Sequence, residues 1–188
     1  MDPETAILET EESMEKAVEY LHHEFATVRT GKASPGLIEN IDVHVPSYGS
    51  TMKLKQLAMI TAPEARLLEV KVFDPSTTQD VERAIRESRL GLNPAAASMS
   101  LRIPIPELSE ERRIQMVKLV KQLAEEAKVR VRSARKDGMD MAKKLKNDNL
   151  LTEDGQKDHE TEVQKLTDKY VKIIDEQVAA KEKEVMKV

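Results

Sequence analysis

Apolar residues recur at helical spacing in three separate stretches of the chain. In residues 7–28 they follow one another at steps of three, four or seven positions, which places them on one side of a helix. A second stretch, from about Ser109 to Lys146, repeats this spacing, and a third follows Thr152, a suitable helix N-cap. Three helices that are apolar on one face only must bury those faces against one another, which predicts a three-helix bundle.

The residues expected to form the bundle core share this spacing and are almost all aliphatic. In the first helix they are Ile7, Met14, Val18, Leu21, Phe25 and Val28. In the second helix they are Met116, Val120, Leu123, Ala127, Val131, Ala134, Met141 and Leu145. In the third helix they are Val163, Leu166, Tyr170, Ile173 and Val178.

The middle of the chain has a different pattern. Seven of the eight prolines and four of the six glycines fall between Gly31 and Pro106. Short β-branched or alternating runs there predict strands, and "TTQDVERAIRES" predicts one short helix capped by Thr77 or Thr78. The strand-like runs are "IENIDVHVP", "LKQLAMITA", "RLLEVKVFD" and "SMSLRIPIP". We therefore expect an α+β protein in which residues 1–30 and 106–188 form the bundle and residues 31–105 form an inserted β/α/β domain.

Two connections join the inserted domain to the bundle, and their composition predicts a hinge. Glycines give the backbone freedom at one connection, while prolines restrict which torsions can change. The hinge residues that we expect are Gly31, Pro35, Gly36, Pro104 and Pro106.

The composition narrows the possible functions. The chain has 188 residues, 34% of them charged and 3% aromatic, with no tryptophan and no cysteine. Without cysteine, disulfides, cysteine-based zinc sites and thiol nucleophiles are excluded. The acidic N-terminal sequence lacks the basic start of a signal peptide, and no apolar run is long enough to cross a bilayer. We expect a soluble cytoplasmic protein, a monomer without membrane contact.

Candidate catalytic, metal and nucleotide motifs are weak. His22 and His23 are adjacent on a helix, and no Glu or His stands four residues further on. "TGKAS" resembles part of a phosphate loop, but Ala26 occupies the position where that loop needs its first glycine. "LGLNP" is better explained as a helix C-cap at Gly91. We expect no catalytic residue, no metal site and no cofactor.

Basic residues on the second long helix give a stronger signal. Lys121, Lys128, Arg132 and Arg135 follow at steps of seven, four and three, with Lys136 at the edge of this line. These five residues are called the basic stripe below. "KVRVRSARK" holds five basic residues in nine and no acid, so we expect that pairing within the helix cannot neutralise the stripe. The plain alternative is a solvated helix face paired with nearby acids.

We expect the stripe to bind an external polyanion and not merely to face solvent. Arginine engages phosphate oxygens with its planar fork, and a chain with two Phe and three Tyr lacks stacking platforms for single-stranded bases. Structured RNA recognised through its backbone is the expected ligand. A rival interpretation is a helical scaffold or cochaperone that binds proteins through its bundle, although it explains neither the stripe nor the hinged insertion.

Five segments, in matching order and spacing, carry a resemblance to a known family. They are "VRTGKASPGLIENI", "VFDPSTTQDVERAIRESRLGLNP", "LRIPIPELSEERR", "VKLVKQLAEEAKVRVRSARKD" and "VQKLTDKYVKIIDEQVAAKEKEVM". Along essentially its whole length the chain resembles the bacterial and organellar ribosome recycling factors. The resemblance implies an L-shaped, transfer-RNA-like protein of two hinged domains. It also implies binding to large-subunit RNA at the intersubunit face of the post-termination ribosome. With the GTPase elongation factor G, such factors split the ribosome, and messenger and deacylated transfer RNA leave.

The resemblance also suggests which residues bind the ribosome. The family's ribosome-binding arginines fall on Arg29, Arg113, Arg132 and Arg135, two of which already lie on the basic stripe. Departures from the common pattern are mild. They are Lys136 in place of an arginine, and Ser133, Gly138 and Met139 in place of Asn, Ala and Asn. Gly138 inside a helix is expected to cost about 1 kcal/mol relative to alanine.

Overall fold

The computed structural model describes residues 1–187 and divides into two compact units. The first contains Met1–Phe25 and the chain from Gln115 onward, and the second is Ala26–Ile114. The expected boundaries were residues 30 and 106. The observed ones lie outside them because the first helix already ends at Ala26, and because the segment before Ile114 groups with the inserted unit.

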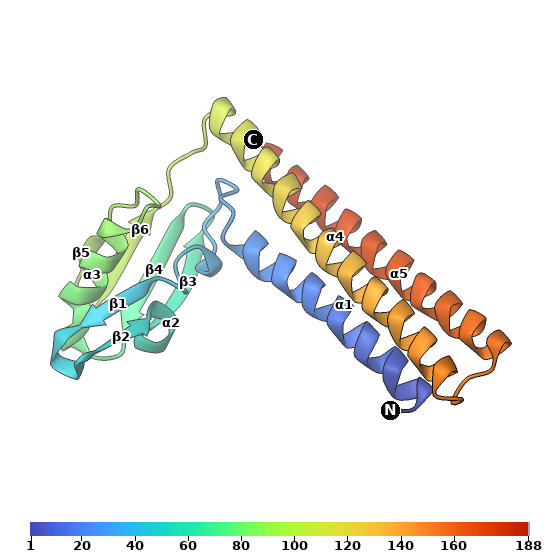
Figure 1. Ribbon diagram of the computed structural model, residues 1–188. Helices are drawn as coiled ribbons and strands as arrows, with labels where there is room; N and C mark the ends of the chain where they lie inside the picture. Colours follow the sequence, from blue (N-terminus) through green and yellow to red (C-terminus); the bar gives the residue numbers. More distant parts are fainter. Residues whose placement is uncertain (188) are drawn as a thin grey trace. The chain divides into compact units, whose positions relative to one another are not determined.

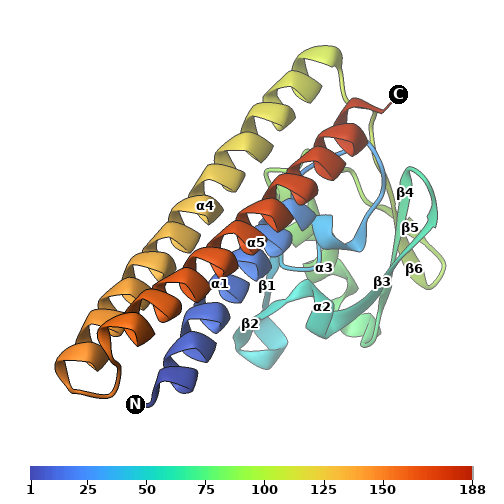
Figure 2. The same cartoon turned by 90° about the vertical axis from the view of Figure 1, so that its right-hand side faces the viewer.

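The first unit is a bundle of three helices, α1 (Pro3–Ala26), α4 (Glu110–Asn147) and α5 (Glu153–Met186). Both views show the three side by side, with α4 and α5 antiparallel and joined by a short turn (Figures 1 and 2). The Thr152 hydroxyl accepts a hydrogen bond from the Gly155 amide at 3.0 Å, which confirms the predicted cap of α5. The α1 terminus is capped by Asp2, whose carboxylate accepts from the Thr5 amide at 2.9 Å.

The bundle core contains smaller residues than the spacing alone predicts. Twelve of the expected core positions are buried, among them Met14, Leu21, Val131 and Tyr170, while the others are half-buried. The structure adds small residues that the sequence analysis did not include. They are Ala6, Thr10, Ala17, Ala124, Gly138, Ala142 and Thr167. Small side chains allow the helices to approach closely, and they carry too little apolar surface to stand out in a periodicity count.

The inserted unit is built on a four-stranded antiparallel sheet with strand order β3-β4-β6-β5. Its strands are β3 (Ala58–Glu64), β4 (Leu67–Val72), β5 (Ala95–Ala97) and β6 (Ser100–Pro104). A separate hairpin pairs β1 (Asp42–Val45) with β2 (Ser50–Lys53). The short α2 (Leu54–Leu57) and the longer α3 (Thr78–Glu87) complete the unit.

One aliphatic core joins these elements of the inserted unit. Strand residues Leu68, Val70, Leu101 and Ile103 are buried together with Val81 and Ile85 of α3, in one cluster with residues of β1 and α2. Alternate residues of β4 and β6 face this core, as the period of two along a strand requires.

Three local details differ from the sequence-based expectation. Thr77 occupies the N-cap position of α3, as expected, but its hydroxyl donates to the Asp74 carbonyl and makes no capping hydrogen bond. The Asp74 carboxylate accepts from the Ser76 amide and caps the 3-10 turn before α3. Helix α3 ends at Glu87, so Gly91 does not cap it. Gly91 has a positive φ of 66°, but it lies in the loop that follows. The strands β2 and β5 and the helix α2 were not expected, since they are short.

Candidate nucleic-acid interface

The basic stripe lies beside α5, along the line where α4 and α5 pack together. Lys128 is half-buried, and its Nζ lies 2.7 Å from Asp175 Oδ1 on α5. The Nε of Arg135 donates to Gln164 Oε1 at 2.7 Å, again on α5. Lys121 Nζ lies 3.9 Å from Glu182 Oε1. Lys128 and Arg135 are thus held by polar side chains of the neighbouring helix, while the contact of Lys121 is longer than a hydrogen bond.

Pairing within α4 is only partial, because one carboxylate lies near two of the five stripe residues and the other three have no acidic partner on this helix. Glu125, one helical turn before Lys128, lies 3.9 Å from its Nζ, and the Glu125 carboxylate also lies 3.6 Å from Arg132 Nη2. The nine-residue count began at Lys128 and so left Glu125 out. Partners from α5 could not be found in this way, because Asp175 and Glu182 are distant in sequence and reach the stripe only through packing.

Lys121, Arg132 and Lys136 are the stripe residues with the least internal pairing, since the only ionic contact of Lys121 in the described part of the chain is at 3.9 Å and its side chain is 66% exposed. The Arg132 side chain is 60% exposed, and its contact with Glu125 is longer than a hydrogen bond. Lys136 is exposed and has no ionic partner among residues 1–187. These three side chains are therefore available to an external anion. Arg130 points elsewhere and stacks on the Tyr20 ring of α1, with its guanidinium carbon 3.8 Å from the ring centroid.

The two arginines suggested by the family lie near the connections between the units. Arg29 follows the end of α1 and is half-buried, and its Nη1 donates to the Leu90 carbonyl at 3.4 Å. Arg113 is half-buried in the first turn of α4, where its amide donates to the Ser109 carbonyl at 3.0 Å. Both belong to the inserted unit in the division of the chain, whereas the stripe belongs to the bundle.

The expected hinge residues fall into two groups. Pro35 and Gly36 form a 3-10 turn, and Pro104 is the last residue of β6, so all three are in ordered elements of the inserted unit. Gly36 is required by close approach, because a Cβ there would lie 3.0 Å from that of Ala26. Gly31 has a positive φ of 79° and lies, like Pro106, outside helices and strands.

Both connections are hydrogen-bonded to the same part of the inserted unit, the hairpin turn between β3 and β4. The Ala33 amide donates to the Ala65 carbonyl at 2.7 Å, and the Ile105 amide donates to the Arg66 carbonyl at 2.8 Å. The Arg66 guanidinium also pairs with Glu107. The chain between Ala26 and Ala33, and that between Glu107 and the start of α4, lie outside these bonds.

Residues 1–187 contain no group of three or more His, Cys, Asp or Glu side chains placed to hold a metal ion. In the same part of the chain, no helix has the length and apolarity that crossing a bilayer requires.

Comparison with known proteins decides the family. The family model described as "Ribosome recycling factor" matches residues 21–186. The chain belongs to the ribosome recycling factor family. A ribosome-recycling factor of Akkermansia muciniphila is 65% identical over the whole of both chains, and one of Rubrobacter xylanophilus is 46% identical over 96% of each.

Solved structures of the family are similar in fold. A solution structure of a ribosome recycling factor matches with a TM-score of 0.76 and 40% identity, over 100% of this chain and 99% of the other. A second match, also 40% identical, has a TM-score of 0.70 and covers 99% of this chain and 100% of the other. It is the T. thermophilus ribosome recycling factor, described together with E. coli elongation factor G as bound to the E. coli post-termination complex.

Proposed function

We propose that this chain binds large-subunit RNA at the intersubunit face of the post-termination ribosome through the outer side of its basic stripe. With elongation factor G and GTP it then separates the subunits, and messenger and deacylated transfer RNA are released. Family membership supports a role in ribosome recycling. The match to a recycling factor described with elongation factor G on the post-termination complex supports the choice of partners.

The RNA-binding part of the proposal rests on the exposure and weak pairing of the Arg132 side chain. Its guanidinium is exposed, and its one acidic neighbour, Glu125, is itself exposed and shared with Lys128. Exposed ion pairs of this kind contribute little to stability, so an RNA phosphate can replace the carboxylate at small cost. A guanidinium offers two parallel donors to one phosphate, which favours it over the ammonium groups nearby.

Lys128 and Arg135 contribute differently in this proposal. Their contacts of 2.7 Å with Asp175 and Gln164 hold them in place and satisfy part of their hydrogen-bonding capacity. They add positive potential behind Lys121, Arg132 and Lys136, and those three make the direct phosphate contacts. The residues available for direct contact are therefore fewer than the five of the stripe.

The energy for separation comes from the partner GTPase in this proposal. The chain supplies a body that binds RNA through one unit and carries a second unit, to which the partner can deliver a displacement. Purified alone, the protein should hydrolyse neither GTP nor peptidyl ester, and activity of the isolated chain that survives repurification would contradict this.

Cosedimentation with ribosomes over a range of salt concentrations tests the RNA contact. We expect Arg132→Ala to weaken binding roughly ten-fold, and to make the slope of log affinity against log salt shallower by about 1. The matched control is Arg86→Ala on α3, because Arg86 is equally exposed, at 59%, and is also paired with a glutamate of its own helix. Equal behaviour of the two variants would remove Arg132 from the interface.

A further inference from the structure

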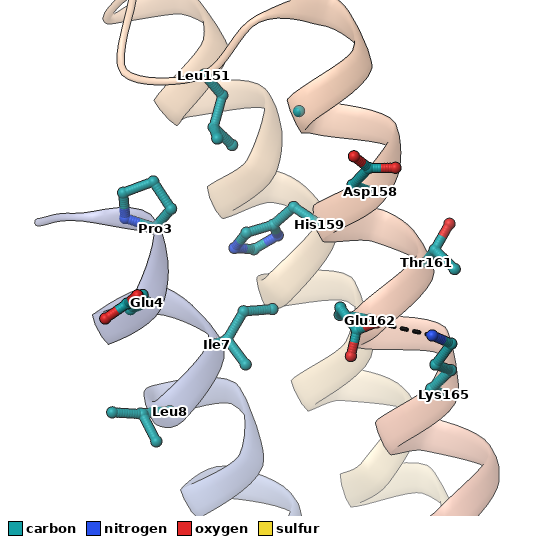
Figure 3. A pocket seen from close by; sticks show the side chains of 11 residues that line it. Pro3, Glu4, Ile7, Leu8, Leu151, Asp158, His159, Thr161, Glu162 and Lys165 are labelled. Carbon is teal, nitrogen blue, oxygen red and sulfur yellow. Dashed lines mark hydrogen bonds and ion pairs between the residues drawn. The ribbon is translucent and has the colours of Figure 1, made fainter.

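A groove lies at the end of the bundle where α1 and α5 begin, away from the stripe residues described above. Its volume is about 730 Å³, which is in the range of sites that hold small organic molecules. Its apolar lining comes from Pro3, Ile7 and Leu8 of α1 and from Leu151 just before α5 (Figure 3). Leu8 is 64% exposed, so the groove presents apolar surface to solvent.

A buried histidine lies in the middle of this lining. His159 of α5 points toward α1, with Leu151 on one side of the ring and Ile7 on the other (Figure 3). The residue is 5% exposed, and neither ring nitrogen has a hydrogen-bond partner among residues 1–187. A neutral imidazole carries one donor and one acceptor, so both capacities are unused here. Burying a donor and an acceptor without hydrogen-bond partners costs stability. The unpaired ring nitrogens therefore point to a ligand that forms a hydrogen bond with them.

The charges around the groove favour a positively charged ligand. Glu4, Asp158 and Glu162 line it together with Lys165, but the Lys165 Nζ is already bound to Glu162 Oε1 at 2.8 Å. Glu4 and Asp158 have no ionic partner in the described part of the chain, so the groove carries excess negative charge. At the two helix ends, where backbone amides can attract an anion, the Thr5 amide is already bound by Asp2 and the Gly155 amide by Thr152.

We propose that this groove is a binding site for a small amphipathic amine. The apolar body of the ligand packs on Ile7, Leu8 and Leu151, and its ammonium group is attracted by Asp158 and Glu4. One ammonium N–H donates to an imidazole nitrogen of His159. Because both ring nitrogens lie beneath the groove surface, a lining side chain such as Leu151 rotates to admit the ammonium. This inference does not depend on the proposed function.

Titration of the full chain with tryptamine, followed by NMR, tests the site. Indolepropionate is the matched control, because it has the same ring and linker with a carboxylate in place of the amine. We expect tryptamine to bind with a dissociation constant on the order of 1 mM, and indolepropionate about ten-fold more weakly or not at all. Equal binding of the two, or binding of neither, would overturn the proposal.

Two substitutions test the role of His159. His159→Phe keeps the ring and removes the unpaired nitrogens, so it should fold at least as stably as the original chain, and we expect it to bind tryptamine about five-fold more weakly. His22→Phe on the exposed side of α1 should leave binding unchanged. In the unaltered protein the His159 ring resonances should shift on titration. Unaltered affinity in His159→Phe, or ring resonances that stay in place, would remove His159 from the site.

Discussion

Gly138 lies in the C-terminal half of α4, at a point that α1 and α5 both approach closely. A Cβ at this position would lie 2.9 Å from both Cγ2 and Oγ1 of Thr10 on α1, and 3.1 Å from Val163 Cγ1 on α5. Thr10 cannot easily rotate away, because its hydroxyl donates to the Ala6 carbonyl at 2.9 Å. The glycine that the sequence marks as a helix weakness is therefore a packing requirement. Its propensity cost is offset by the close approach that it permits.

This packing predicts that Gly138 and Thr10 are energetically coupled. Gly138→Ala alone should lower the free energy of unfolding, because overpacking, which costs about 1–3 kcal/mol, outweighs the gain in helix propensity. With Thr10→Ala already present, the same change should cost less, because only the contact with Val163 then opposes the gain in helix propensity of about 1 kcal/mol. Urea unfolding of the four proteins in this cycle measures the coupling. Ser133→Ala, an exposed change in the same helix, is the control, and strictly additive effects would contradict the packing account.

Glu125 provides a second test at the residue scale. Removing its charge frees Arg132 and Lys128 from an internal partner, so we expect Glu125→Gln to tighten ribosome binding several-fold at low salt. Glu12→Gln on α1 is the matched control, because that glutamate has similar exposure and is also paired with a lysine of its own helix. Cosedimentation measures both. Weaker binding of Glu125→Gln would mean that the carboxylate orients Arg132 for RNA and does not compete with it.

At the scale of elements, α1 and α5 are joined by a polar cluster as well as by their apolar faces. The Tyr170 hydroxyl lies 3.0 Å from Glu11 Oε1 and 3.1 Å from Glu15 Oε1, and Lys169 Nζ lies 3.1 Å from Glu11. Hydrogen bonds from Lys169 and then Tyr170 lower the pKa of the Glu11 carboxyl below its usual value. Burial, with the two carboxylates nearby, raises the pKa of the Tyr170 hydroxyl.

The pKa of Glu11 predicts a pH dependence of stability. A carboxyl with a lowered pKa in the folded state contributes stability above its unfolded pKa, and this contribution is lost as the pH falls through the folded value. Tyr170→Phe should therefore lower the free energy of unfolding by about 1–2 kcal/mol at neutral pH, and by less in acid, where the Glu11 carboxyl is protonated. Urea unfolding at several pH values measures this. A loss that is the same at every pH would contradict the role of the carboxylates.

The sequence predicts an element best where apolar residues repeat at regular spacing along one face of a long helix. The three long helices and the cap at Thr152 are confirmed, because spacing and capping are local signals. The strands β2 and β5 were missed because "STMK" is largely exposed and "AAA" has no β-branched residue, so only pairing with a neighbour makes them strands. In the candidate interface, the positions of the basic residues could be predicted, but their partners could not. Asp175 and Gln164 meet the stripe only once α5 has folded back on α4.

At the scale of the whole molecule, the proposed function requires one unit to move relative to the other, and this motion depends on the two connections between them. Hydrogen bonds at Ala65 and Arg66 hold each connection to the inserted unit, and only short segments remain outside them. We propose that bending is concentrated near Gly31 on one side and just after Pro106 on the other, while Pro35, Gly36 and Pro104 move with the inserted unit.

Locking the two units together tests whether their relative motion matters. Cysteines can be introduced one per unit without competition, because the chain has none, and joined by a short linker that contains a disulfide. We expect the locked protein to keep its ribosome affinity but to lose subunit splitting, and reduction of the linker to restore it. The uncrosslinked double-cysteine protein is the control. Normal splitting by the locked protein would show that the connections are only spacers.

Subunit separation itself tests the central claim most directly. Light scattering of purified post-termination ribosomes should fall when this chain, elongation factor G and GTP are all present, and should stay constant when any one is left out. Arg132→Glu should fold normally, since it changes an exposed side chain, yet should nearly abolish the fall through repulsion of RNA phosphate. Full splitting by Arg132→Glu would contradict RNA binding through the stripe, and constant scattering with the unaltered chain and both partners would contradict the proposed function.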